Sequence, residues 1–171
     1  MARLQRNAFI EKNKPAIPAW PQWRDLIAGQ PIVASYHPAG SEADPQVLVA
    51  AARAAHCRIA LPALTPASPL IRFRQHDEGA PLEEGPFHIL QPAGHAPALA
   101  PAVILLPLLA FTRSGIRLGQ GGGHYDRAAA HWPDALRIGI AWSVQESAAL
   151  PQEPWDMPLH AIATEREWIT I

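Results

Sequence analysis

Short apolar runs recur along the chain from residue 31 onward, and two longer helical stretches lie among them. The run over 103–107 is apolar at every position, which is typical of a strand buried on both faces. The run over 70–74 alternates apolar and basic residues, which predicts a strand with one face in water. Together the runs predict strands over 32–36, 58–61, 70–74, 103–107, 137–142, 160–164 and 167–171, and helices over 46–55 and 125–132.

The first 30 residues follow a different pattern. Pro15, Pro18 and Pro21 interrupt them, and a long helix cannot pass through three such prolines. We expect one short helix before Pro15 and another near residues 23–28. The chain therefore divides into a divergent segment, 1–30, that packs on an α/β domain, 31–171.

Strands that alternate with helices predict right-handed crossovers and a mostly parallel sheet with helices on both faces. Ligands bind such sheets beyond the carboxyl ends of the strands. Two loops qualify, residues 37–44 and residues 112–126. Asp44 and Pro45 also predict the start of the first long helix, because an acid caps free N–H groups and proline suits a first turn.

Composition narrows the classes of protein. A length of 171 residues suits one domain, and 14 basic against 15 acidic residues give a net charge of −1. Such a balance argues against a general nucleic-acid binder, and no run approaches the length of a membrane span. The start, MARLQRNAFIEKNK, lacks the apolar core of a secretory signal, so we expect a cytoplasmic protein. The single cysteine, Cys57, is expected to be a buried small hydrophobe.

A glycine-rich loop carries the clearest chemistry. Four glycines lie within five residues, between Arg117 and the sequence Tyr125-Asp126-Arg127. Glycine permits close backbone approach, and amides before a helix start can cradle a phosphate. Arg117 adds a planar cation and Asp126 a carboxylate suited to Mg²⁺. The plainer interpretation is a turn that only joins a strand to a helix.

Four segments, in order, resemble one family. The loop Arg-Leu-Gly-x-Gly-Gly-Gly-x-Tyr-Asp-Arg over 117–127 follows an apolar strand that ends Leu-Pro-x-Leu-Ala-Phe. The segments 35–44, 86–92 and 156–165 match further family motifs. On these residues the chain resembles the 5-formyltetrahydrofolate cyclo-ligases, also called methenyltetrahydrofolate synthetases. The resemblance covers residues 31–165 and implies a three-layer α/β/α sandwich similar to the NagB/RpiA/CoA-transferase-like fold.

The resemblance also implies an activity and its residues. The family converts 5-formyltetrahydrofolate and ATP, with Mg²⁺, to 5,10-methenyltetrahydrofolate, ADP and phosphate. The partners expected are therefore a reduced folate and ATP, with neither nucleic acid nor membrane, for a monomer or weak dimer. The implied catalytic residues are Arg117, Tyr125 and Asp126, with Asp126 on the metal. Residues implied to bind nucleotide are Arg117, Gly119, Gln120, Gly121, Gly122, Gly123, His124 and Tyr125; those implied to bind folate are Glu42, Phe87 and Tyr125.

Each implied role has a plainer counterpart. Glu42 also suits a solvated turn or a helix cap, Tyr125 and Phe87 suit the core, and Asp126 suits a cap of the following helix. His124, His160 and Gln91 depart from the family pattern, and prolines break the family's long basic N-terminal helix after Lys14. Arg3, Arg6 and Lys14 are candidates to supply its cations. The alternative is that the chain is a homologue that binds folate or nucleotide without catalysis. A third, weaker hypothesis is a different nucleotide or sugar-phosphate enzyme with the same fold.

Overall fold

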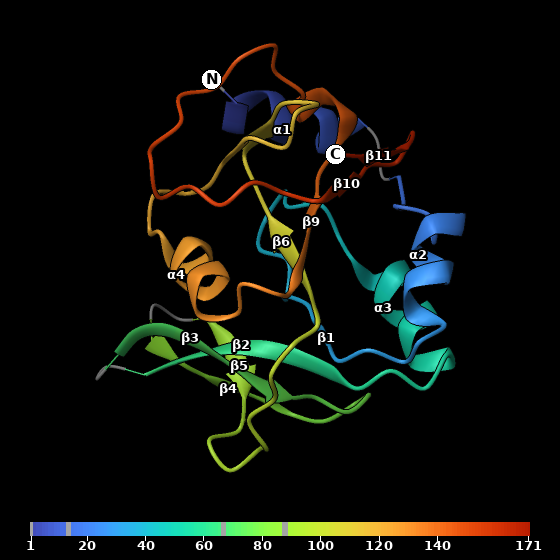
Figure 1. Ribbon diagram of the computed structural model, residues 1–171, viewed down its shortest axis with the longest axis vertical. Helices are drawn as coiled ribbons and strands as arrows, with labels where there is room; N and C mark the ends of the chain where they lie inside the picture. The colour runs from blue at the N-terminus through green and yellow to red at the C-terminus, as the bar shows by residue number, and fades with distance from the viewer. Residues whose placement is uncertain (1, 13–14, 66–67, 87–88) are drawn as a thin grey trace.

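The structure is a computed structural model that describes residues 2–12, 15–65, 68–86 and 89–171 (Figure 1). The helices are α1 (Ala2–Lys12), α2 (Pro21–Ile27), α3 (Gln46–Ala54), α4 (His124–His131) and the short 3-10 helix η2 (Ser143–Gln145). The strands are β1 (Val33–Ala34), β2 (Ile59–Thr65), β3 (Ser68–Gln75), β4 (Leu82–Glu84), β5 (Leu90–Pro92), β6 (Val103–Pro107), β7 (Ala110–Phe111), β8 (Arg117–Leu118), β9 (Leu136–Ile140), β10 (Ala161–Ala163) and β11 (Trp168–Thr170). Among these described helices, none is long and apolar enough to cross a membrane.

Seven strands form one sheet in the order β11-β10-β9-β6-β1-β2-β3. The five inner strands, from β10 to β2, pair in parallel. The edge strands β3 and β11 pair antiparallel to their neighbours. The predicted α/β fold with a mostly parallel sheet is therefore confirmed, and the crossovers leave the carboxyl ends of the inner strands at one edge.

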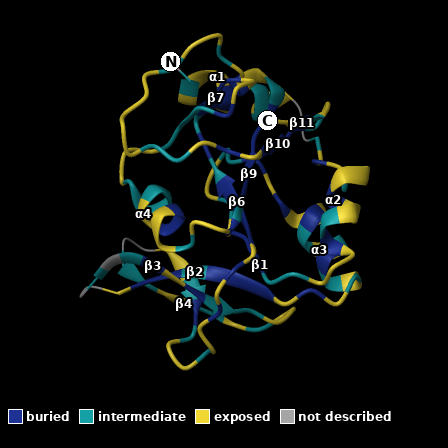
Figure 2. Cartoon of the chain, in the orientation of Figure 1, coloured by how far each residue is buried: buried dark blue, intermediate teal, exposed yellow. Residues whose placement is uncertain are grey.

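The central strands are apolar because they are covered on both sides. Val103 and Leu105 of β6 pack in one core cluster, and Ile104 and Leu106 pack in the other. In Figure 1, α2 and α3 lie on one side of these strands and α4 on the other, which gives three layers. Figure 2 shows the same pattern, with buried residues along the central strands and exposed ones on the outer faces of the helices.

The start of α3 follows from its sequence. Asp44 Oδ1 accepts a hydrogen bond from the backbone N–H of Gln46 at 2.9 Å, and Pro45 sets the direction of the first turn. Leu48 and Ala52, one turn apart, are the buried residues of the helix. Cys57 is buried just beyond its end, as expected, and burial raises the pKa of its thiol.

Three details differ from the sequence predictions. The strand expected over 32–36 is only Val33–Ala34. The region 75–100, where no strand is predicted, contains the β4–β5 hairpin, and a second hairpin, β7–β8, leads into the glycine-rich loop. These strands have two or three residues each, too few to show a period in the sequence. The two short N-terminal helices are confirmed as α1 and α2.

Candidate active site

The loop after β1 forms an acidic turn, residues 37–44, held from within. Tyr36, buried at the end of β1, donates its hydroxyl hydrogen bond to the carbonyl of Ala43. The Glu42 Oε2 atom accepts the backbone N–H of Ala39 at 2.9 Å. The turn thus fixes the Glu42 carboxylate, one of the folate-binding residues implied by the resemblance, at the carboxyl end of a central strand.

The glycine-rich loop, residues 119–123, owes its path to two left-handed residues. Gly121 has φ +91° and Gly123 has φ +60°, a region that side chains with a Cβ rarely adopt. No heavy atom lies within 4 Å of a Cβ built on Gly121, so that side of the loop is open. At its far end Arg127 Nη2 donates to the carbonyl of Gly122 at 2.8 Å and lies 3.1 Å from Nδ1 of His124.

The two predicted loops meet through one hydrogen bond. Gln120, in the glycine-rich loop, donates from Nε2 to Glu42 Oε1 at 2.6 Å, across 78 residues of sequence. This contact places Glu42, implied to bind folate, beside Gln120, implied to bind nucleotide. It also agrees with the expectation that both loops lie beyond the carboxyl ends of the sheet.

Arg117 and Asp126 form a partly enclosed ion pair under the loop. Nη2 of Arg117 donates to Oδ1 of Asp126, and the two side chains are 7% and 21% exposed. The Nε atom of Arg117 is buried and has no hydrogen-bond partner among the residues that the structure describes, which is costly unless a ligand supplies an acceptor. A Cβ built on Gly119 would lie 3.6 Å from Nη1, so the guanidinium adjoins the loop backbone.

Two tyrosines lie within the electrostatic field of Glu42. Desolvation by burial raises the pKa of Tyr125, on the first turn of α4, and Glu42 raises it further while Arg117 opposes the change. Burial likewise raises the pKa of Tyr36, with a smaller contribution from Glu42. Both phenols are therefore neutral near neutral pH. The Tyr36 hydroxyl already donates to Ala43, whereas the Tyr125 phenol can hydrogen-bond a ligand without adding negative charge.

The N-terminal helix α1 supplies two cations to this site. Nη2 of Arg3 donates to Gln120 Oε1 at 3.0 Å, and Nε of Arg6 donates to Ser41 Oγ at 2.9 Å. Arg6 is only 4% exposed and also donates to the carbonyl of Leu108 at 3.4 Å. Burial lowers the pKa of Arg6, and Glu42 partly opposes that shift. The prolines that interrupt this region follow α1, so they leave these contacts intact.

Several residues of the site were missed by the sequence analysis. The indole N–H of Trp142 donates to the carbonyl of Ser41 at 3.0 Å, and Phe9 of α1 packs on that ring with centroids 5.9 Å apart. Gln145, buried in η2, donates from Nε2 to the carbonyls of Leu108 and Leu109. No spacing or composition signal marks these residues, because their partners lie far away in the sequence.

Two candidate residues lie outside the described part of the chain. These are Phe87, implied to line the folate site, and Lys14, a candidate cation. His160 lies apart from the residues above, with its Nδ1 accepting the backbone N–H of Arg137 at 2.9 Å. Gln91 is used structurally, since its Oε1 accepts the backbone N–H of Leu64 at 2.9 Å.

Metal binding would fall to few protein groups. Within the described ranges, no three His, Cys, Asp or Glu side chains gather closely enough to hold an ion. Mg²⁺ at nucleotide sites usually takes one or two carboxylates and completes its shell with phosphate oxygens and water. Asp126, next to the glycine-rich loop, suits that arrangement.

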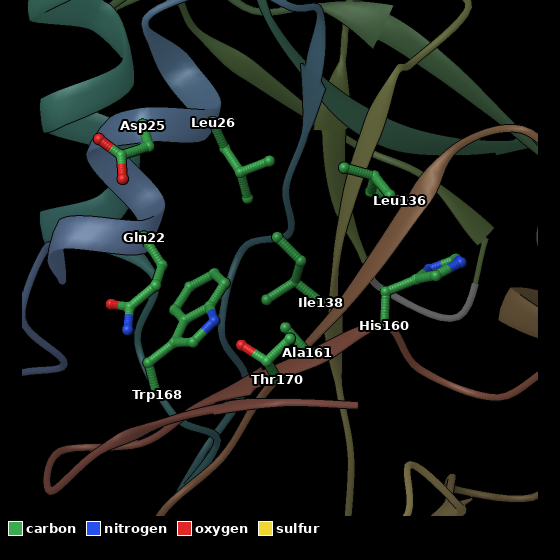
Figure 3. A pocket seen from close by; sticks show the side chains of 9 residues that line it. All are labelled: Gln22, Asp25, Leu26, Leu136, Ile138, His160, Ala161, Trp168 and Thr170. Atoms are coloured by element: carbon green, nitrogen blue, oxygen red, sulfur yellow. The ribbon is translucent and has the colours of Figure 1, made fainter.

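A hollow of about 420 Å³ lies elsewhere, between α2 and the strands β9, β10 and β11 (Figure 3). Its lining is mostly apolar, with Trp168, Leu136 and Ile138 prominent and His160 at one side. None of its lining residues belongs to the acidic turn or the glycine-rich loop. The converging polar groups identify the loop region, rather than this hollow, as the candidate site.

Comparison with known sequences places residues 26–165 within the model of the 5-formyltetrahydrofolate cyclo-ligase family. A curated cyclo-ligase from Haemophilus influenzae is 33% identical over 96 residues, 53% of this chain and 51% of the relative. One from Escherichia coli K12 is 44% identical over 64 residues, 36% of this chain and 35% of the relative. The matched segments thus span about half of these relatives or less.

Comparison with solved structures agrees on the fold. The 5,10-methenyltetrahydrofolate synthetase of Aquifex aeolicus superposes with a TM-score of 0.70 at 23% identity, covering 99% of this chain and 92% of that one. The synthetase of Mycoplasma pneumoniae gives 0.59 at 18% identity, covering 94% and 96%. At these identities the likeness establishes the arrangement of helices and strands.

Proposed function

The chain belongs to the 5-formyltetrahydrofolate cyclo-ligase family, and we propose that it performs the ATP- and Mg²⁺-dependent cyclisation of 5-formyltetrahydrofolate. The products are 5,10-methenyltetrahydrofolate, ADP and phosphate. The observation that carries the proposal is the hydrogen bond between Gln120 and Glu42, at 2.6 Å, which joins the glycine-rich loop to the acidic turn. A nucleotide on the loop and a pterin on the turn would lie next to each other.

The phosphate side of the site would consist of backbone amides and guanidinium groups. Amides of the open glycine-rich loop precede α4, so its N-terminal dipole adds to their attraction for an anion. Arg117 offers the unpartnered Nε atom, and Arg6 is a buried cation with only hydroxyl and carbonyl oxygens as its hydrogen-bond partners in the described structure. Buried donors of this kind gain most when an anion fills the site.

The folate side would rest on Glu42 and Tyr125. A carboxylate is an acceptor that suits the paired N–H donors of a pterin ring, and the neutral Tyr125 phenol offers a ring face and a donor. Phe87 is a further candidate by resemblance. Glu42 is held by the backbone N–H of Ala39, so its carboxylate is oriented before the ligand arrives.

The chemistry needs positioning and charge stabilisation more than covalent help. The oxygen of the N5-formyl group attacks the γ-phosphorus of ATP, and ADP leaves. N10 then attacks the formyl carbon and loses its proton, and phosphate departs with the original formyl oxygen. Arg6, Arg117 and the loop amides would hold the transferred group and its charge near the formyl oxygen.

Magnesium would be held by Asp126 together with the phosphates. The ion pair with Arg117 uses Oδ1, so Oδ2 is the oxygen that we assign to the metal or its water. When bound, Mg²⁺ neutralises charge on the phosphate oxygens. The residues present fit this role because such ions need few protein ligands.

A turnover assay tests the proposal. Purified protein with 5-formyltetrahydrofolate, ATP and Mg²⁺ should form methenyltetrahydrofolate, followed by its near-ultraviolet absorbance, with ADP in equal amount. Omission of ATP or Mg²⁺ is the control and should abolish the product. Folate binding without turnover would support the non-catalytic homologue instead. The cytoplasmic location and the division of the chain at residue 30 stay predictions.

A further inference from the structure

The side-chain amide of Gln120 connects three parts of the site. Its Oε1 accepts from Nη2 of Arg3 in α1 at 3.0 Å, and its Nε2 donates to Oε1 of Glu42 in the acidic turn at 2.6 Å. The chain of bonds Arg3–Gln120–Glu42, which we call the amide relay, spans 117 residues of sequence on one side and 78 on the other. Both of its bonds are exposed to solvent.

The relay ties up Glu42, which the proposed function assigns to folate, and Arg3, one of the cations that α1 brings to the site. A pterin that donates to Glu42 competes with Gln120 for the carboxylate charge. A phosphate next to the glycine-rich loop competes with Gln120 for the Arg3 guanidinium. Either substrate therefore weakens one of the two bonds that hold the amide in place.

We propose that the amide relay couples the two substrate sites, so that each substrate binds more tightly once the other is bound. A substrate that displaces Gln120 from one partner frees the amide to turn, which releases the other partner for the second substrate. The first substrate bears the cost of breaking the relay, and the second does not. This inference rests on the proposed function, because it concerns regulation of the same site.

The chemistry of the amide is what the relay requires. Gln120 offers a donor to the acid and an acceptor to the cation on one rigid group. Methionine has a side chain of similar length without those groups. Glutamate would keep the bond to Arg3 but repel Glu42. The relay is thus a property of the residue at position 120 as well as of the loop backbone.

Thermodynamic linkage determines how the coupling between the two substrates must appear in their affinities. Coupling between two ligands is reciprocal, so folate must raise the affinity for nucleotide by the factor by which nucleotide raises the affinity for folate. A solvent-exposed hydrogen bond contributes modestly, so we expect a factor of roughly twofold to tenfold.

Calorimetry on the full chain tests the relay. The affinity for 5-formyltetrahydrofolate is measured with and without a saturating non-hydrolysable ATP analogue and Mg²⁺, and the affinity for the analogue with and without folate. In the unsubstituted protein each ligand should raise the affinity for the other, and the two factors of increase should be equal. In Gln120→Met each factor should fall close to one, whereas Gln5→Met, the same change at an exposed glutamine of α1, should keep the original factors.

The outcomes separate the relay from the proposed function. If either ligand fails to bind the original chain, the proposed function fails and the relay fails with it. If both bind independently, or oppose each other, the relay alone is wrong. Equal positive coupling in the original chain and in Gln120→Met would also overturn the relay, while leaving the enzyme assignment intact.

Discussion

Two arginines, Arg117 and Arg137, both have enclosed side chains but meet very different surroundings. The Arg117 side chain is 7% exposed; within the described part of the chain it has one carboxylate partner, and its Nε atom has no hydrogen-bond partner. Arg137, in β9, is 5% exposed and is enclosed by carbonyl groups. Its Nε donates to Pro158 at 2.9 Å, and its Nη1 donates to Pro133 at 3.3 Å and Ala135 at 3.2 Å.

The difference separates a cation of the fold from a cation of the site. Backbone carbonyls accept hydrogen bonds from the guanidinium of Arg137, and these bonds hold loops to the sheet. Arg117 keeps a buried donor that no described residue satisfies, next to a loop that is open at Gly121. Burial alone would have grouped these side chains together, whereas the state of their donors divides them.

The strongest way to break this comparison is Arg117→Met. We expect kcat to fall by about a thousandfold, because removal of a cation that stabilises transition-state charge costs two to three orders of magnitude or more. Urea denaturation should show little loss of stability. Steady-state kinetics measures kcat, and the urea midpoint measures the change in stability.

Arg113→Met is the matched control for Arg117. Arg113 lies in the same hairpin and also pairs with carboxylates, those of Glu146 and Glu167, but its side chain is 53% exposed. Exposed ion pairs contribute little, and this one is not part of the candidate site, so both kcat and stability should change only slightly. Turnover by Arg117→Met equal to that of Arg113→Met would mean that Arg117 is structural.

Asp126→Asn sharpens the assignment of the partner of Arg117. We expect a fall in kcat of about tenfold to a hundredfold and a higher Mg²⁺ concentration for half-maximal rate, because the amide is a poorer ligand for a hard cation. A residue that only caps α4 would not move the Mg²⁺ dependence. Asp134→Asn, an exposed acid beyond the same helix, is the control, and equal Mg²⁺ curves for the two variants would contradict the metal role.

The sequence predicted that both loops belong to the candidate site, but neither their contact nor the partners of the cations could be assigned. Apolar runs such as 103–107 revealed the inner strands, and the rule that ligands bind beyond carboxyl ends brought 37–44 and 112–126 together. The partner of Arg6 is Ser41, on a different element, and its second acceptor is the carbonyl of Leu108. Such pairings depend on how α1 docks, which no local pattern encodes.

Arg137 shows that a purely structural role is equally hard to predict from the sequence. The sequence predicted a strand over 137–142 and gave its first residue no role. Its hydrogen bonds go to carbonyls, which every residue possesses, so composition carries no trace of them. The short β4–β5 hairpin was not predicted for a related reason, because its pairing is set by main-chain groups over three residues in each strand.

Arg137→Met tests the structural half of the comparison. We expect the free energy of unfolding to fall by about 2 kcal/mol, because buried carbonyls lose their donors. Turnover by the remaining folded protein should stay near normal, in contrast with Arg117→Met. Arg58→Met, which removes an exposed arginine with a single bond to Gln75, is the control for loss of charge.

A large loss of kcat in Arg137→Met with stability unchanged would reverse the two assignments. Chemical denaturation, combined with an active-site titration that counts folded molecules, distinguishes the outcomes. The same two measurements should be made on Arg117→Met. Each arginine then has a measured effect on the free energy of unfolding and a measured effect on turnover.

The smallest expected effect is a pH dependence of stability through His160. Burial lowers the pKa of His160 below its ordinary value of 6.5, and the Arg137 charge lowers it further. Its Nδ1 accepts the backbone N–H of Arg137, which requires that nitrogen to be unprotonated. The unfolded chain therefore takes up a proton at a higher pH than the folded chain does, so stability is lost as the pH falls through about 6.5.

His160→Gln should flatten that dependence. Denaturation midpoints measured between about pH 7.5 and about pH 5.5 should fall more steeply for the original chain than for the variant. His95→Gln, a change at an exposed loop histidine, should keep the original slope. Equal slopes for all three proteins would mean that the Arg137 enclosure is insensitive to the imidazole, and the stability of that enclosure would then rest on the carbonyl groups alone.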